Sequence, residues 1–279
     1  MDEMRFASAA KAANTSAAVV VAGDLVNVWN SPTQIGGFDT VWPTMFDRGR
    51  VHLIPGNHDV NSMEKNATVF KTMLRHYHAS FGVDYHSFRT EFATFVMINS
   101  ESLIAPHLGL NGTTDPWVLN QSETQWAWLD TTLAAASSGA RPHTVLVTHH
   151  PPFLKSPTEK HLYWNWPLGI RKRLLGLLTT YGVHYVLAGH THTTTSHTFG
   201  APLNLTIYTV AGTARAFDNN GCGYRVLHIN ATSIDVEYVR QDDPTLKQCT
   251  RARTTLIHPA FADRPELART WANVSWLLN

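Results

Sequence analysis

Short apolar runs recur along this chain, and polar clusters follow several of them directly. Each run is four to seven residues long and is rich in valine, isoleucine, leucine and aromatic residues, a composition typical of buried β-strands. The runs lie at residues 18–22, 51–54, 92–98, 144–147, 183–187, 206–210, 224–229 and 234–239. A chain with this pattern is predicted to build its core around β-sheets.

Helical patterns lie between several of these runs. Apolar residues recur at helical spacing over residues 64–79, 121–136 and 169–181. Ser122 and Gln125 predict a capping box that opens the second of these helices. The fold class is therefore α/β. Turn residues rather than helices separate the last three strands, which predicts mixed sheets with an antiparallel portion at the C-terminal end.

The length of the chain suits one domain. With 279 residues, 43% of them hydrophobic, the chain can bury one large core, which we expect over residues 1–258. Beyond this point a polar tail punctuated by proline follows, residues 259–279, and its Trp271, Trp276 and Leu277 are predicted to pack on the surface. No apolar run reaches the roughly 20 residues that a membrane-spanning helix requires, so we expect no membrane span.

Net charge and composition indicate which classes of partner and which cellular compartment to expect. The 22 basic and 21 acidic residues give a net charge of +1, which argues against nucleic acid or an anionic membrane as a partner. Seven Asn-x-Ser/Thr sequons favour a glycoprotein of the secretory pathway, extracellular or lysosomal, although the first fifteen residues lack the apolar core of a signal peptide. The sequons lie at Asn14, Asn66, Asn111, Asn120, Asn204, Asn230 and Asn273. In an oxidising lumen Cys222 and Cys249 could form a disulfide; the alternative is two unrelated buried thiols.

Four polar clusters follow predicted strands. They are Gly23-Asp24, the segment 56–59 (Gly-Asn-His-Asp), the segment 148–152 (Thr-His-His-Pro-Pro) and the segment 189–192 (Gly-His-Thr-His). Because ligands bind at the carboxyl ends of strands in open α/β sheets, we expect the clusters to converge. Singly, each is more often a turn or a packed histidine. Together, their imidazole, carboxylate and amide groups without thiolate indicate a metal site.

In this order the clusters resemble motifs two to five of the calcineurin-like metallophosphoesterase superfamily, over roughly residues 18–240. Residues 163–166 (Tyr-Trp-Asn-Trp), together with Asn99-Ser100, are similar to the branch that contains calcineurin-like phosphoesterase domain-containing protein 1. The resemblance implies a four-layer α/β/β/α sandwich of two mixed sheets. It also implies two divalent metal ions, Mn, Fe or Zn, at the top of the sheets, and a phosphorylated substrate.

The resemblance also assigns roles. Asp24 would bridge the two metals, Asn57, His149 and His190 would hold the second, and His192 would reach the first. A hydroxide between the metals would be the nucleophile. His58 would donate to the phosphoryl oxygen or leaving group, and Asp59 would fix its tautomer. Asn99, His150, Asn165 and Arg171 are tentative substrate-binding residues, with structural roles as the alternative.

One part of the family pattern has no match. The first motif, Asp-x-His at the end of an opening strand, would lie before Gly23, and none of the 22 residues there forms it. We therefore expect that the chain begins after this motif and lacks the first strand of one sheet. With Asp24 and His192 as its only ligands, the first metal would be weak or absent, so the chain would hold one metal or none.

These features favour a metal-dependent phosphomonoesterase, with phosphoproteins as one candidate substrate class. A secreted or lysosomal phosphodiesterase or acid-phosphatase-like enzyme is a second hypothesis, because the same centre serves monoesters and diesters. A non-catalytic binding protein on the same scaffold is a third. Retention of His58 and Asp59, which a binding protein does not need, argues against the third.

Overall fold

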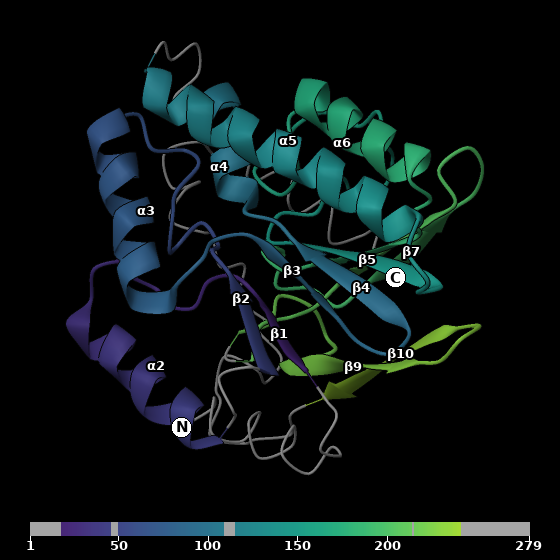
Figure 1. Ribbon diagram of the computed structural model, residues 1–279. Helices are drawn as coiled ribbons and strands as arrows, with labels where there is room; N and C mark the ends of the chain where they lie inside the picture. Colours follow the sequence, from purple (N-terminus) through teal and green to yellow (C-terminus); the bar gives the residue numbers. More distant parts are fainter. Residues whose placement is uncertain (1–17, 46–49, 109–114, 214, 241–279) are drawn as a thin grey trace.

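The computed structural model describes residues 18–45, 50–108, 115–213 and 215–240 (Figure 1). Its strands are β1 Val19–Ala22, β2 Val51–Ile54, β3 His86–Arg89, β4 Ala93–Met97, β5 His143–Thr148, β6 Tyr185–Ala188, β7 Ser196–Phe199, β8 Leu205–Thr209, β9 Gly223–Ile229 and β10 Ile234–Arg240. Its helices are α2 Pro32–Met45, α3 Ala67–Phe81, α4 Ser100–Ile104, the 3-10 turn η2 Ala105–His107, α5 Pro116–Ser137 and α6 Leu168–Thr180.

Six strands form one mixed sheet in the order β3-β4-β5-β6-β8-β7. The four central strands are parallel, and β3 and β7 pair antiparallel at the two edges. Successive side chains of these strands face opposite layers. Val96 and Leu146 pack against α4, α5 and α6, whereas Phe95, Met97 and Val145 face the remaining strands. The central strands are therefore apolar on both faces, as a doubly covered sheet requires.

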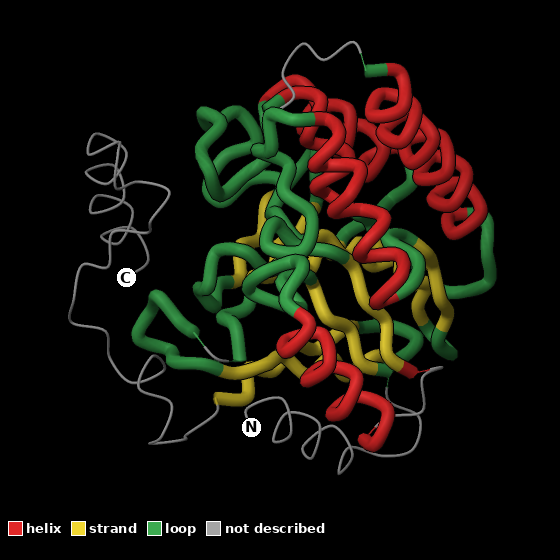
Figure 2. The backbone as a smooth tube through the Cα atoms, turned by 90° about the vertical axis from the view of Figure 1, so that its left-hand side faces the viewer, coloured by secondary structure: helices red, strands yellow, loops and turns green. Residues whose placement is uncertain are grey.

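The remaining strands form the second β-layer. β1 pairs parallel with β2, β9 pairs antiparallel with β10, and no ladder joins the two pairs among the described strands. Ile54 of β2 and Ile234 of β10 pack on the inner face of the six-stranded sheet. On the other side, Phe38 of α2 and Phe70 and Leu74 of α3 pack against Val19. Figure 2 shows the strands in the middle with helices on either side, so the predicted order of four layers is confirmed.

All eight predicted strands are present, with an antiparallel pair, β9 and β10, at the C-terminal end of the described residues. The sequence did not predict β3 and β7, which are four-residue edge strands containing histidine and serine. The predicted start of α5 was wrong. Asp115 caps this helix by accepting from the amides of Trp117 and Val118, and Pro116 opens it, so Ser122 and Gln125 lie inside the helix and are buried.

Several predictions fall outside the described residues. They are the missing first strand, the C-terminal tail and the position of Cys249. Cys222 is buried and disulfide-bonded; the oxidising compartment remains a prediction. Of the sequon asparagines, Asn66, Asn120, Asn204 and Asn230 are described and exposed; their glycosylation remains a prediction.

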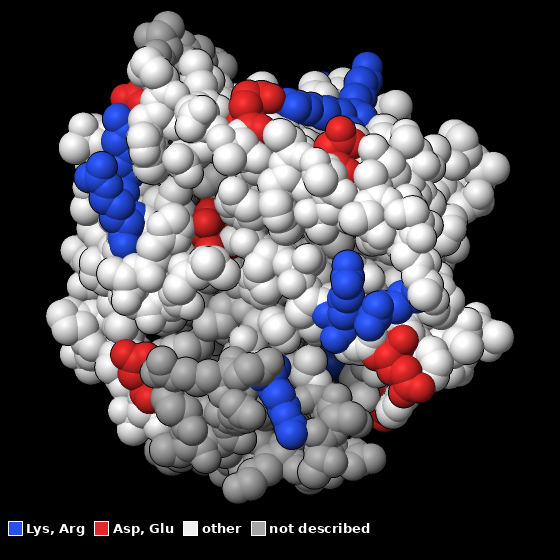
Figure 3. Space-filling view, in the orientation of Figure 1, with Lys and Arg blue, Asp and Glu red and all other residues white. Residues whose placement is uncertain are grey.

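The surface carries little charge. On the face seen in Figure 3, basic and acidic side chains lie in several separate groups, with uncharged surface between them. Among the helices that the structure describes, none combines the length and apolar character needed to cross a membrane.

A histidine pair connects the two β-layers. His52 Nδ1 of β2 lies 3.2 Å from His86 Nε2 of β3, and the His52 ring stacks on Phe88 with 3.4 Å between ring centroids. Burial first, and the neighbouring His86 second, lower the pKa of His52 to about 4. Burial also lowers the pKa of His86. The folded protein therefore favours the uncharged form of both rings.

This pair predicts a destabilisation by acid. Between the unfolded pKa of about 6.5 and the folded value of about 4 for His52, the unfolded chain binds more protons, so stability falls as the pH falls through this window. We expect His52→Phe, which keeps a ring against Phe88, to lose less stability than the parent protein between pH 7.5 and pH 5. Urea midpoints at both pH values measure this difference, and an equal loss in both proteins would contradict it.

Candidate metal centre

The four polar clusters meet at the carboxyl ends of β1, β2, β5 and β6. Gly23 and Asp24 follow β1, and His149 and His150 follow β5 directly. The loops after β5 and β6 are joined by a hydrogen bond from Gly189 N to His149 O of 3.0 Å. The parallel direction of β1 with β2 and of β5 with β6 brings these loops to one edge, so the predicted convergence is confirmed.

Two glycines permit the close approach of these loops. A methyl group on Gly56 would collide with Asp24 Oδ1 and with the Asp24 amide nitrogen. A methyl group on Gly23 would lie 2.5 Å from His149 Nδ1, and Gly23 has a φ of 91°, which disfavours other residues. These glycines let the backbones of β1 and β2 pass beside the His149 ring.

Backbone strain is concentrated at the candidate ligands. Asp24, His190 and His192 have φ values of 55°, 64° and 51°. They are three of the four described non-glycine residues with positive φ. This conformation costs such residues roughly 1–2 kcal/mol each, so the surrounding structure must hold it. Strain of this kind is typical of functional sites.

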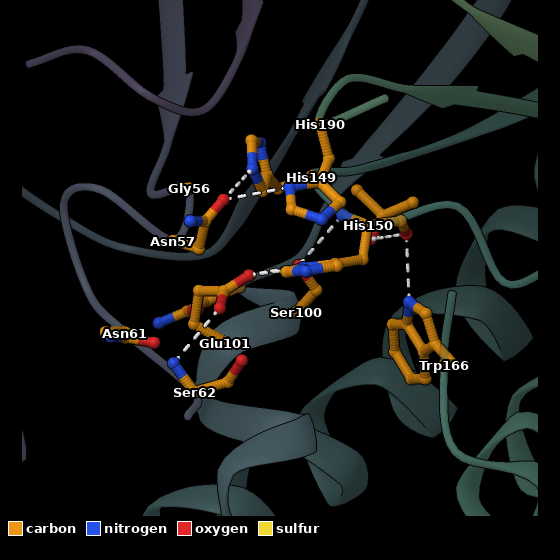
Figure 4. A network of polar contacts seen from close by, with 12 residues as sticks. Gly56, Asn57, Asn61, Ser62, Ser100, Glu101, His149, His150, Trp166 and His190 are labelled. Carbon is orange, nitrogen blue, oxygen red and sulfur yellow. Dashed lines mark hydrogen bonds and ion pairs between the residues drawn. The ribbon is translucent and has the colours of Figure 1, made fainter. Parts of the chain in front are cut away.

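Asn57 lies at the centre of the site. Its Oδ1 is 3.0 Å from His149 Nε2 and 2.8 Å from His190 Nδ1 (Figure 4). Its Nδ2 donates to the hydroxyl of Tyr163 at 3.2 Å. Asp24 Oδ1 approaches the same nitrogen of His149 at 3.4 Å. An amide oxygen, a carboxylate oxygen and two imidazole nitrogens therefore face one another.

The outer contacts of the two rings fix their tautomers. His149 Nδ1 lies 2.7 Å from Ala22 O, and His190 Nε2 lies 3.1 Å from Tyr163 O. A carbonyl oxygen only accepts, so these nitrogens carry the ring hydrogens. The inward nitrogens of the neutral rings then hold lone pairs that face the lone pairs of Asn57 Oδ1. Such an arrangement is repulsive until a cation occupies it, and its oxygen and imidazole donors suit Mn, Fe or Zn.

Burial favours the uncharged forms of His190 and His192. Burial first, then the neighbouring His150 and His149, lower the pKa of His190 well below its ordinary value. His192 also has a lowered pKa, mainly because it is buried, although the Asp24 charge opposes the shift. Its Nδ1 lies 3.2 Å from Arg215 O, which leaves Nε2 as the nitrogen with a lone pair. Among the described residues, His192 shares no hydrogen bond with Asn57, His149 or His190. Its role as a ligand of a second metal remains a prediction.

The predicted pairing of His58 with Asp59 is wrong. Both Asp59 oxygens accept from backbone amides, those of Leu25, Val26 and Gly56, at 2.8 to 3.1 Å. His58 Nδ1 instead lies 3.0 Å from Asn27 O, so a backbone carbonyl fixes its tautomer. Burial, and then the Asp24 charge, raise the pKa of Asp59 to about 7 against these three hydrogen bonds. Asp59 ties the loops after β1 and β2 together beneath the site.

For three of the tentative substrate-binding residues the structure supports the alternative of a structural role, because each is buried and bonded within the protein. Asn99 caps α4 and donates to Asp84 Oδ2 at 2.8 Å. Asn165 donates to Glu159 Oε1 and Lys160 O. Arg171 donates only to the backbone carbonyls of residues 157, 159 and 166. Asn165 and Arg171 thus hold the loop between β5 and α6, and Asn99 holds the start of α4.

Two further residues of the site were not predicted. Glu101 is fully buried, and its Oε1 lies 2.6 Å from His150 Nδ1. Burial raises the pKa of Glu101, but the interactions with His150 outweigh burial, so the net shift of this pKa is downward. Tyr163 contacts both Asn57 and His190, and its ring lies 4.7 Å from that of His190. Glu101 stands in no motif, and Tyr163 begins the 163–166 segment, but the sequence assigned Tyr163 no role at the site.

The Tyr163 hydroxyl predicts a measurable effect on metal affinity. Tyr163→Phe keeps the ring and the backbone carbonyl but leaves Asn57 Nδ2 without this partner, so the amide can turn its oxygen away. We expect zinc or manganese to bind about 10–100-fold more weakly, as measured by calorimetry. In an Asn57→Asp background the same change should cost little, since a carboxylate has no amide orientation to lose. An equal loss in both backgrounds would contradict this account.

Known proteins are similar to this chain in sequence. The sequence profile of the calcineurin-like phosphoesterases matches residues 4–194. The serine/threonine-protein phosphatase CPPED1 of Rattus norvegicus is 28% identical over 191 residues, 68% of this chain and 56% of the relative. That of Danio rerio is 28% identical over 185 residues, 62% of this chain and 53% of the relative. The chain thus spans about half the length of the curated relatives it matches, and the predicted resemblance to this branch is confirmed.

Solved structures agree in fold. GAP50, described as the anchor in the inner membrane complex of Plasmodium, aligns with a TM-score of 0.55 and 13% identity, covering 89% of this chain and 80% of that protein. The purple acid phosphatase PPD1 from yellow lupin (Lupinus luteus) seeds aligns with a TM-score of 0.51 and 15% identity, covering 76% and 39%. The layered fold, the convergence of the four clusters and the matched profile together show that this chain belongs to the calcineurin-like phosphoesterase family.

Proposed function

We propose that this chain hydrolyses phosphate monoesters at the site around Asn57, with phosphoproteins as the substrate class. Family membership supports phosphoester hydrolysis in general, and the name of the CPPED1 relatives supports the protein substrate. The observation that carries the proposal is the approach of two imidazole nitrogens, His149 Nε2 at 3.0 Å and His190 Nδ1 at 2.8 Å, to Asn57 Oδ1. That geometry is expected of a cation site.

The residues present fit one divalent cation well. Asn57, His149, His190 and the Asp24 carboxylate would hold it, and Asp24 with His192 would contribute to a second. A bound divalent cation supplies Lewis-acid stabilisation of the phosphoryl charge and makes a water molecule more acidic. Among the described residues, no lysine or arginine forms an ion pair with Asp24, which leaves its charge available for this purpose.

His58 is the residue best placed to act on the phosphoryl group. It follows Asn57 directly, and the Asn27 carbonyl holds its Nδ1 hydrogen. Its amide donates to Asp24 Oδ1 at 3.0 Å, which couples its position to the carboxylate. With Nδ1 occupied, Nε2 is the nitrogen that can hold a proton for the phosphoryl oxygen or the leaving group. Asp59 supports this loop from below through the backbone amides.

The test combines metal content with turnover. The protein is loaded with manganese or zinc, its metal content is determined by elemental analysis, and hydrolysis is followed on an aryl phosphate, a bis-aryl phosphate diester and a phosphoserine peptide. We expect turnover of both monoesters to exceed that of the diester. His190→Ala should lower turnover by at least about 100-fold, since it removes a ligand. His184→Ala, which alters a histidine bonded to Asn204 O far from these contacts, is the matched control and should retain activity.

Each other result points to a different function. Preference for the diester would replace the monoesterase proposal with a phosphodiesterase. Turnover of the aryl phosphate without the phosphopeptide would remove the protein substrate. Stoichiometric metal without turnover of any ester would identify a metal-binding protein on this scaffold, and a His190→Ala variant as active as the parent would refute the site itself.

A further inference from the structure

Glu101 and His150 form a buried pair beside the site formed by Asn57, His149 and His190. Glu101 is fully buried and His150 is 4% exposed. Glu101 Oε1 lies 2.6 Å from His150 Nδ1 and accepts from Ser100 Oγ at 3.2 Å, and Oε2 accepts from the Ser62 amide at 3.2 Å (Figure 4). Among the described residues, no lysine or arginine forms an ion pair with this carboxylate. Its only charged or chargeable bonded partner is therefore an imidazole.

The backbone of His150 is held by hydrogen bonds as well. Its amide donates to Ser100 Oγ at 3.2 Å, and its carbonyl accepts from Thr148 Oγ1 and Trp166 Nε1 at 3.1 and 2.9 Å. Because a carboxylate accepts, Nδ1 carries the ring hydrogen, and Nε2 of the neutral ring holds a lone pair. The Glu101 contact fixes the tautomer of the ring, and the backbone hydrogen bonds hold the residue that carries it.

The same pattern holds for all three buried histidines. Each ring has one hydrogen bonded to an acceptor outside the cluster: Ala22 O for His149, Tyr163 O for His190 and Glu101 for His150. One ring nitrogen from each of the three lies within 4.8 Å of the others. The ring centroids of His150 and His190 are 3.8 Å apart, and those of His149 and His150 are 5.2 Å apart. Three imidazoles thus form one compact group.

A histidine that donates one ring hydrogen to a carboxylate and leaves the other nitrogen free is a common arrangement among metal ligands. We propose that His150 is an additional ligand of the ion held by Asn57, His149 and His190, with Glu101 as its carboxylate partner. The inference rests on the proposed metal site and deepens it. Three imidazoles and an amide oxygen form a nitrogen-rich set that favours ions such as zinc and cobalt over magnesium or calcium.

The test uses cobalt as a paramagnetic probe of the whole chain. Hydrogen-bonded ring N–H protons of ligating histidines give strongly shifted proton resonances. We expect His150→Gln to remove one such resonance and to weaken cobalt binding at least about 10-fold, as measured by competition with a chromophoric chelator. Glu101→Gln keeps an acceptor for Nδ1 but removes the charge, and should weaken binding about 10–100-fold. His184→Gln is the control, expected to bind within about twofold of the parent.

A purely structural pair gives a different result. If His150→Gln and Glu101→Gln lower the unfolding temperature of the metal-free protein while cobalt affinity and every shifted resonance remain, the inference is refuted. Absence of any shifted resonance with cobalt in the parent chain refutes it as well. Ester hydrolysis without a shifted resonance from the His150 ring would refute this inference and leave the proposed function in place. A shifted His150 resonance without ester hydrolysis would support this inference and refute the proposed function.

Discussion

The contact of the Asn57 side-chain oxygen with two imidazole nitrogens is the constraint on which the rest of the site depends. This oxygen lies 3.0 Å from His149 Nε2 and 2.8 Å from His190 Nδ1. It accepts no hydrogen bond from these rings in their neutral form, because their ring hydrogens point to Ala22 O and Tyr163 O. Three sets of lone pairs kept together in a buried place cost free energy. The surrounding hydrogen bonds of the fold must offset this repulsion. A bound cation would replace the repulsion with attraction, because all three lone pairs would then face a positive charge.

The surrounding structure shows how this arrangement is held. Left-handed backbone at Asp24, His190 and His192 turns the ends of β1 and β6 sharply inward. Gly23 and Gly56 allow these turns to touch, and Asp59 anchors the two loops through three backbone amides. The apolar layers on both faces of the six-stranded sheet fix the strands from which these loops depart. The packing of the core thus stabilises the strained backbone at the site.

The sequence predicted the strands and the ligand clusters because both are local signals. An apolar run followed by Gly-Asp or Gly-His-Thr-His marks a strand end and a ligand together. Glu101 and Tyr163 carry no such local mark, since their contacts to His150 and Asn57 span 49 and 106 residues. For Asn99 and Arg171, in contrast, residue type alone suggested a substrate-binding role. Their types suit phosphate binding, but the fold uses them to satisfy buried backbone and side-chain groups.

The central claim, that a divalent cation lies between Asn57, His149 and His190, is tested most directly by anomalous diffraction at the zinc edge from crystals grown with zinc. The account predicts a peak about 2.0–2.2 Å from Asn57 Oδ1 and from the inward nitrogens of both histidines. A contradictory result would be no peak there, with the Asn57 amide turned so that Nδ2 donates to the two rings. The cluster would then be an ordinary hydrogen-bonded core, and the function would have to be sought elsewhere.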